Sequence, residues 1–233
     1  MKFGDNERLI VTDVICHGVP SQQMFTDYLK ELQKKNGKNV IEDFSFRTKE
    51  SGWGLCAMLT TKSPKGEIKR KRIPCNISSF YKMFLQCEIY RDSCYECPFA
   101  SKERVSDLTI GDYWGVEKVK DVYEKCRKNN YDIVKGISCI LVNTEKGMEY
   151  VNKSNLELIE SDYDNIAREN HQLYRPSFCP ETRNEIVGEY VKAGYGGLEK
   201  QFDKKLGIRK YIIVFKNKIP PNIRMKIKML LKK

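Results

Sequence analysis

Two cysteines at a metal-ligand spacing, Cys94 and Cys97, are the residues of this chain best suited to chemistry. A Cys-x-x-Cys pair lets the backbone turn so that both thiolates aim at one point, and it can hold a metal ion or one corner of an iron–sulfur cluster. A polar loop, residues 98–107, joins the pair to a short apolar strand expected at 108–110. One such pair is half a site, so further ligands have to come from elsewhere.

A third cysteine, Cys16, follows a run of β-branched and apolar residues at 9–15. The Gly/Pro-containing loop after it ends at Ser21, and apolar residues at helical spacing then run to about residue 35, so we expect a strand, a loop and an N-capped helix. Cys16 would lie at the carboxyl end of the strand, where open α/β sheets usually bind ligands. Its position alone fits a small buried hydrophobic residue equally well.

The remaining elements alternate between strand and helix. The sequence predicts strands at 40–47, 53–61, 67–73, 136–142 and 156–159, and helices at 79–87, 144–153, 162–169 and 181–191. Glycines at 194, 196 and 197 are expected to break the last helix.

This pattern predicts an α/β fold, with α+β as the alternative: a mixed sheet with flanking helices. We expect one compact domain at 8–205, after a short lead at 1–7 and before a basic tail at 206–233.

The amino-acid composition favours a globular protein in a reducing compartment. An apolar fraction of 40% indicates a globular chain. Nine cysteines, an odd number, without an apolar leader favour a reducing, cytoplasmic compartment over a disulfide scaffold.

The net charge of +11 is concentrated at one end of the chain. Residues 209–233 hold nine Lys or Arg and no acid, which leaves about +2 for the rest. The body has no basic and aromatic pattern typical of nucleic-acid binding, so we expect no nucleic-acid partner. The tail can rest on an anionic membrane surface or an acidic partner, or it can be a solvated terminal helix.

Two further loops have residues that suit a cofactor. Arg47 and Lys49 stand beside Trp53 and can hold a phosphate or the edge of a flavin, although a solvated charged turn beside a core Trp is the commoner arrangement.

The second loop is the Gly-Asp-Tyr-Trp-Gly block after the strand at 108–110. Gly111 allows close backbone approach to a cofactor, Asp112 can accept a hydrogen bond from it, and Trp114 can cover its ring. Alternatively, Asp112 caps a turn and the aromatic residues complete the core.

Four blocks together resemble the carboxy-terminal domain of the coenzyme F420 hydrogenase/dehydrogenase beta-subunit family. They are DVICHGVPS, FRTKESGWG, RDSCYECPFASKERVSDLTIGDYWG and GISCILVNTEKG, at 13–21, 46–54, 91–115 and 136–147. They occur in the family's order, and the resemblance runs from about residue 8 to residue 190.

The resemblance implies an oxidoreductase that passes electrons between FAD and a [4Fe-4S] cluster, with coenzyme F420 or another molecule as the further acceptor. Cys16, Cys94 and Cys97 would be three cluster ligands. The partner expected is a ferredoxin-like or flavin-binding polypeptide. The resemblance also implies a link to polysaccharide biosynthesis, because bacterial relatives often occur beside genes for it.

One family feature is missing, since no GTPCQ block with the fourth cysteine precedes residue 16. We therefore expect a truncated or split member, whose fourth ligand is another polypeptide, a small molecule, or Cys87, Cys56 or Cys75. For Cys87 we favour core packing.

Three alternatives remain open from the residues themselves: a non-catalytic domain stabilised by zinc, a redox dithiol at Cys94 and Cys97, and an inactive remnant.

Overall fold

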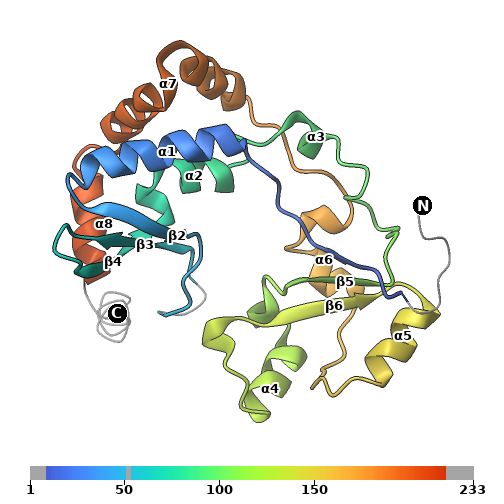
Figure 1. Ribbon diagram of the computed structural model, residues 1–233. Coiled ribbons are helices and arrows are strands. Elements are labelled where there is room, and N and C mark those ends of the chain that lie inside the picture. The colour runs from blue at the N-terminus through green and yellow to red at the C-terminus, as the bar shows by residue number, and fades with distance from the viewer. Residues whose placement is uncertain (1–8, 51–53, 219–233) are drawn as a thin grey trace, which may run out of the picture. The chain divides into compact units, whose positions relative to one another are not determined.

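The computed structural model describes residues 9–50 and 54–218, and its chain divides into two compact units (Figure 1). Unit 1 consists of residues 1–19 and 92–178, and unit 2 consists of residues 20–91 and 179–233. Over the described residues the chain is 45% helix and 17% strand, with two three-stranded sheets, which confirms the predicted α/β class.

Unit 1 is built on a mixed sheet. Its strands, in spatial order, are β1 (Thr12–Val14), β5 (Leu108–Asp112) and β6 (Ser138–Val142). The central strand β5 pairs parallel with β1 and antiparallel with β6. Its first residues, Leu108 and Thr109, are buried, as expected for a strand with neighbours on both edges.

Unit 1 also contains short helices. They are α3 (Asp92–Tyr95), α4 (Lys120–Lys128), α5 (Glu145–Asn152) and α6 (Tyr163–Ala167). Helix α5 begins as its sequence predicts, because the Thr144 side chain accepts a hydrogen bond from the backbone N–H of Gly147 at 3.1 Å.

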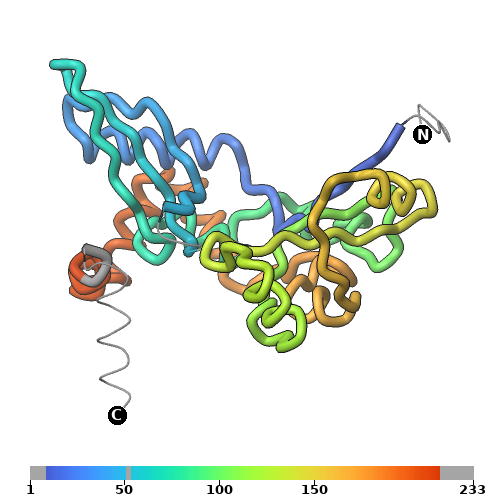
Figure 2. Tube along the Cα trace, turned by 90° about the horizontal axis from the view of Figure 1, so that it is seen from below, coloured from blue at the N-terminus to red at the C-terminus, as the bar shows by residue number. Residues whose placement is uncertain are grey.

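Unit 2 combines an antiparallel sheet with longer helices. The strands are β2 (Val40–Ser45), β3 (Cys56–Lys62) and β4 (Ile68–Pro74), in that spatial order. The helices are α1 (Gln22–Lys35), α2 (Ser79–Leu85), α7 (Thr182–Leu206) and α8 (Arg209–Lys218). Figure 2 follows the chain from α7 into α8, the red coil near the C-terminus.

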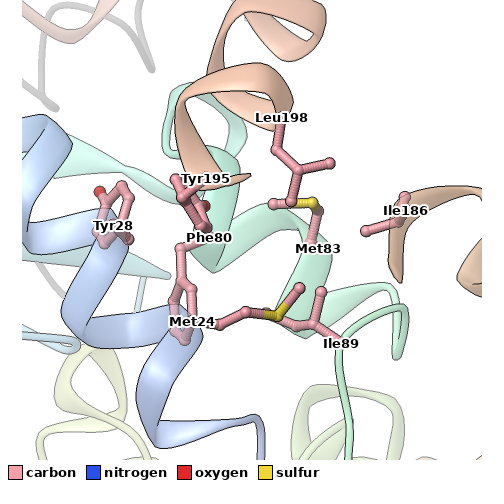
Figure 3. Packing of buried hydrophobic residues seen from close by; sticks show 8 residues of the cluster. All are labelled: Met24, Tyr28, Phe80, Met83, Ile89, Ile186, Tyr195 and Leu198. Carbon is pink, nitrogen blue, oxygen red and sulfur yellow. The ribbon is translucent and has the colours of Figure 1, made fainter. Parts of the chain in front are cut away.

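The core of unit 2 lies where α1, α2 and α7 meet. Figure 3 shows its eight buried side chains: Met24, Tyr28, Phe80, Met83, Ile89, Ile186, Tyr195 and Leu198. The rings of Tyr28 and Phe80 stack, with centroids 5.5 Å apart. The Tyr28 hydroxyl would be costly to bury alone, and it is hydrogen-bonded to the hydroxyl of Ser78 at 2.8 Å. The packing thus uses the apolar face predicted for the first helix.

Some elements differ from the sequence prediction. Residues 156–159 form no strand, because they join neither sheet. Helix α4 lies in a segment whose polar composition gave no helical signal, since its buried side chains are only Val122 and Cys126. The predicted break of the last helix is confirmed at Gly194, where the backbone is non-helical and α7 is kinked. A second helical piece follows directly, because Tyr195 and Leu198 beyond the kink pack in the core.

Candidate functional site: the cysteine loops of unit 1

Cys16 lies just after strand β1, at the carboxyl end, as the sequence predicts. The backbone N–H of Ile15 donates to the carbonyl of Ile110 at 2.9 Å, so the chain stays attached to β5 up to the residue before the cysteine. Beyond that point the loop leaves the sheet and the Cys16 side chain is exposed. Its thiol is therefore accessible to an external metal or cluster.

The Cys-x-x-Cys pair lies on and directly after the single turn of helix α3. Cys94 is within the turn and Cys97 follows it, and both side chains are half-buried. The carbonyl of Cys97 accepts a hydrogen bond from the N–H of Ala100 at 3.2 Å, which turns the chain into the loop toward β5. None of the nine cysteines is in a disulfide, so all three predicted ligands are free thiols.

A hydrogen bond connects the two cysteine loops. The backbone N–H of Val19 points at the sulfur of Cys94, with 3.3 Å between N and Sγ. Val19 is three residues after Cys16, so the loop that carries the first cysteine is attached to the second. The other side of this loop is also held, since Ser177 donates from its hydroxyl to the carbonyl of His17 at 2.7 Å. N–H donors to cysteine sulfur are among the interactions that set the potentials of iron–sulfur clusters.

The three thiols are ligands of the type that an iron–sulfur cluster requires, but they are not already arranged around one point. Three free thiols on two connected loops can supply three corners of a cubane, which needs four ligands. Across residues 9–50 and 54–218, no three His, Cys, Asp or Glu side chains are gathered closely enough to hold one metal ion. The three cysteines would have to draw together for a cluster to bind.

The other cysteines considered as a fourth ligand, Cys56, Cys75 and Cys87, belong to unit 2. Cys56 is buried in β3, and the other two are half-buried. Burial raises the pKa of the Cys75 thiol and of the Cys87 thiol, which disfavours the thiolate that a metal requires. Cys87 lies two residues beyond the end of α2, with φ 61°, and not on a helical face.

In the Gly-Asp-Tyr-Trp-Gly block, both glycines meet other parts of unit 1. A Cβ on Gly111 would lie 2.7 Å from Cδ1 of Ile15, so this glycine makes room for the side chain next to Cys16. Gly115 has φ 80°, which favours glycine, and a Cβ there would lie 2.6 Å from the Cγ of Glu169. Protein packing therefore accounts for both glycines. Contact of Gly111 with a cofactor stays a prediction.

The polar and aromatic residues of the same block lie at the end of β5. The carbonyl of Asp112 accepts hydrogen bonds from Asn170 and from the N–H of Trp114, at 3.3 and 3.0 Å. Burial, and then the nearby charge of Asp112, raise the pKa of the Cys139 thiol to about 11. Trp114 is half-buried, whereas Tyr113 is buried. The buried aromatic is therefore the one that the sequence analysis did not select.

The predicted basic cofactor loop belongs to unit 2. Arg47 is half-buried and Lys49 is exposed, both beyond the end of β2. Trp53, the third residue of that prediction, lies outside the described residues. A cofactor role for these three residues stays a prediction.

Two residues of the loop between Cys97 and β5 gave no functional signal in the sequence, yet they organise the site. Arg104 has a side chain only 5% exposed; its Nη1 donates to the carbonyl of Phe99 and lies 3.6 Å from Oδ2 of Asp13 in β1. Asp107 is buried just before β5 and accepts a hydrogen bond from the N–H of Val11 at 2.9 Å. An arginine and an aspartate in a polar loop look solvated in sequence, and only the parallel pairing of β1 and β5 brings them onto another segment.

Unit 1 also contains a cavity of about 1000 Å³. It is lined by β6, by the segment 156–161, and by residues from α4, α5 and α6. Lys102 and Arg104 supply positive charge to its wall, and the Lys102 ammonium lies 5.2 Å from the ring centroid of Tyr163. A mostly apolar cavity with a few charged groups is typical of a cofactor or small-molecule site.

None of the helices in the described part of the chain has the length and apolar character needed to cross a bilayer. No curated protein and no solved structure matches the chain. One family model does match, and it describes the carboxy terminus of the beta subunit of coenzyme F420 hydrogenase/dehydrogenase. It covers residues 1–164, which include the three predicted ligands Cys16, Cys94 and Cys97. Such a beta subunit functions in electron transfer, beside partner subunits. The chain belongs to the coenzyme F420 hydrogenase/dehydrogenase beta-subunit family.

Proposed function

We propose that this chain is an iron–sulfur and flavin-dependent electron-transfer domain, with Cys16, Cys94 and Cys97 as three ligands of a [4Fe-4S] cluster. The observation that carries the proposal is the hydrogen bond from the N–H of Val19 to Sγ of Cys94, because it joins the two cysteine loops. Ile15 attaches the base of the first loop to β5, so the loop that carries Cys16 starts from a fixed point. The thiols then need to move only within their loops to share a cluster.

Three thiolates leave one iron of a cubane without a ligand from these loops. We propose that this corner is filled from outside unit 1, by a thiolate of a partner polypeptide or by a small molecule. Raised pKa values argue against Cys75 and Cys87 in this role. Membership of a beta-subunit family supports a partner, because such a subunit acts in a complex.

The flavin part of the proposal rests on the cavity of unit 1. Its volume of about 1000 Å³ is large enough for an isoalloxazine ring with its chain. The positive charges of Lys102 and Arg104 suit a phosphate group. We propose FAD as the occupant, with coenzyme F420 or another molecule as the acceptor beyond it.

The test is the content of iron and acid-labile sulfide per chain after anaerobic purification and reconstitution. We expect about four of each in the wild type, with a brown colour, and a large loss in Cys94→Ser. Cys179→Ser is the matched control, because Cys179 is an exposed free thiol outside the proposed ligand set. It should keep the full iron content.

Two outcomes would contradict the proposal. Negligible iron in the wild type would leave the chain without a cluster, and one tightly bound zinc ion lost in Cys94→Ser would assign the thiols to a structural metal site. Flavin binding is measured separately, by quenching of FAD fluorescence. We expect quenching in the wild type and weaker quenching in Lys102→Ala, while the iron content stays unchanged.

A further inference from the structure

Helix α8 presents an apolar stripe to solvent. Ile208, just before the helix, and Tyr211, Ile212 and Phe215 within it have side chains that are 78, 75, 48 and 68% exposed. Their spacing of i, i+3, i+4 and i+7 places all four on one face of a helix. Single exposed apolar residues are common, but four on one face mark a surface that another apolar surface covers.

The stripe is held in place by the body of unit 2. Helix α7 ends at Leu206 and is followed by Gly207, with φ 47°, and α8 starts two residues later at Arg209. The ammonium of Lys210 donates to Oδ1 of Asp203 in α7 at 2.6 Å, which ties the first turn of α8 to the preceding helix. The apolar face of α8 therefore stays exposed and can contact another surface.

The positive charge near α8 indicates which kind of partner surface can cover the apolar stripe. The segment 209–233 holds nine Lys or Arg and no acid, so nine of the eleven net positive charges of the chain follow the stripe in sequence or flank it. A helix with aromatic and aliphatic residues on one face and many cations beside it is typical of segments that lie in the headgroup region of an anionic bilayer. The apolar stripe lies on one face of the described part of α8, so the helix would lie along the bilayer surface.

We propose that α8 and the basic segment after it bind the surface of an anionic membrane, with Ile208, Tyr211, Ile212 and Phe215 inserted at the headgroup level. An acidic protein or a nucleic acid would satisfy the cations but would leave this apolar stripe in water. A bilayer covers both features at once, because its interface offers anionic headgroups above an apolar interior. This proposal is independent of the electron-transfer function.

The experiment is flotation of the full chain with lipid vesicles. One set is phosphatidylcholine alone, and the other contains about three-tenths phosphatidylglycerol. We expect the wild type to float with the anionic vesicles and to be released as KCl rises from about 0.05 to about 0.5 M, because salt screens the lysines. In Tyr211→Ser/Phe215→Ser the partition coefficient should fall on the order of tenfold or more.

A matched control separates the stripe from general surface hydrophobicity. Tyr150 and Phe178 are an exposed tyrosine and an exposed phenylalanine of unit 1, 53 and 74% exposed. Tyr150→Ser/Phe178→Ser should float like the wild type. In Arg209→Gln/Lys226→Gln, partition should fall by about 25-fold for the anionic vesicles only, since each cation near the surface contributes roughly fivefold.

The proposal is overturned if the wild type does not float with anionic vesicles. Retention on immobilised polyglutamate in that case would assign the basic segment to an acidic partner. It is also overturned if the stripe variant and the control variant lose binding equally. Circular dichroism of each variant confirms that the fold is kept.

Discussion

Val11 and Asp107 are joined by two hydrogen bonds. The N–H of Val11 donates to Oδ2 of Asp107 at 2.9 Å, and the N–H of Asp107 donates to the carbonyl of Val11 at 2.9 Å. This pair stands immediately before the parallel register in which Thr12 faces Leu108. It therefore determines where β1 ends relative to β5, and with it the position of the loop that carries Cys16.

Asp107→Asn tests this role. The Asp107 carboxylate also accepts from the hydroxyl of Thr144 at 2.7 Å and lies 3.2 Å from the ammonium of Lys146. The amide removes the charge and turns one acceptor into a donor, so we expect the free energy of unfolding to fall by about 2–3 kcal/mol. Asp132→Asn, at an exposed ion pair with Lys135, is the control and should change it by less than about 1 kcal/mol. Urea denaturation at neutral pH measures both, and equal effects would contradict the assigned role.

The same carboxyl predicts a pH dependence. The N–H of Val11, and then the Thr144 hydroxyl and Lys146, hold the pKa of Asp107 below its ordinary value of 3.8. A lowered pKa means that the folded chain holds this proton less tightly than the unfolded chain. The stabilisation is therefore complete above about pH 4 and is lost as pH falls through the pKa of the folded state. The stability difference between the wild type and Asp107→Asn should shrink across that range, and a difference independent of pH would contradict the prediction.

Gly147 should be intolerant of a side chain although it lies in a helix. A Cβ there would lie 2.4 Å from the carbonyl oxygen of Asp107, a backbone atom that cannot move without disturbing β5. Gly147→Ala should therefore lower the free energy of unfolding by about 1–3 kcal/mol. Gly188→Ala in α7 meets nothing within 4 Å, so it should be neutral or stabilise by up to about 1 kcal/mol. Thermal unfolding of the two variants measures this difference. The explanation would be contradicted if Gly188→Ala lowered the stability as Gly147→Ala does.

The sequence predicts those elements whose signals are local. Ser21 caps α1 as expected, with its hydroxyl accepting from the N–H of Met24 at 3.4 Å, and Thr144 caps α5. The strand at 108–112 and the Cys16 position after β1 also follow from short apolar runs.

What the sequence does not predict depends on pairing between distant segments. Residues 156–159 have the composition of a strand but line the cavity of unit 1 instead. Asp107 looks like one more polar loop residue until β1 lies beside β5. The glycines after 193 correctly predict a break at Gly194, but not that the helix resumes beyond it, where Tyr195 and Leu198 pack in the core. In each case a long-range contact decides the outcome.

Thiol reactivity should divide the nine cysteines by exposure. Cys16 and Cys179 are exposed, whereas Cys139 is buried and its pKa is raised to about 11 by burial and by Asp112. At pH 8 we expect alkylation of the apo protein to reach the two exposed thiols first and Cys139 only after denaturation. Mass spectrometry of peptides after timed labelling measures this order. Early labelling of Cys139 would contradict the burial of β6, and protection of Cys16 after cluster loading would support its role as a ligand.

Gly111 and Ile15 should be energetically coupled. A Cβ on Gly111 would lie within 3 Å of two side-chain atoms of Ile15, so Gly111→Ala should destabilise unit 1 by about 1–3 kcal/mol. Ile15→Ala removes the obstructing atoms, so the double variant should be more stable than the sum of the two single effects predicts. A double-mutant cycle by urea denaturation measures this coupling. Additive effects on the free energy of unfolding would mean that Gly111 does not make room for Ile15. If the double variant bound FAD more weakly than Ile15→Ala does, Gly111 would instead have a role in cofactor binding.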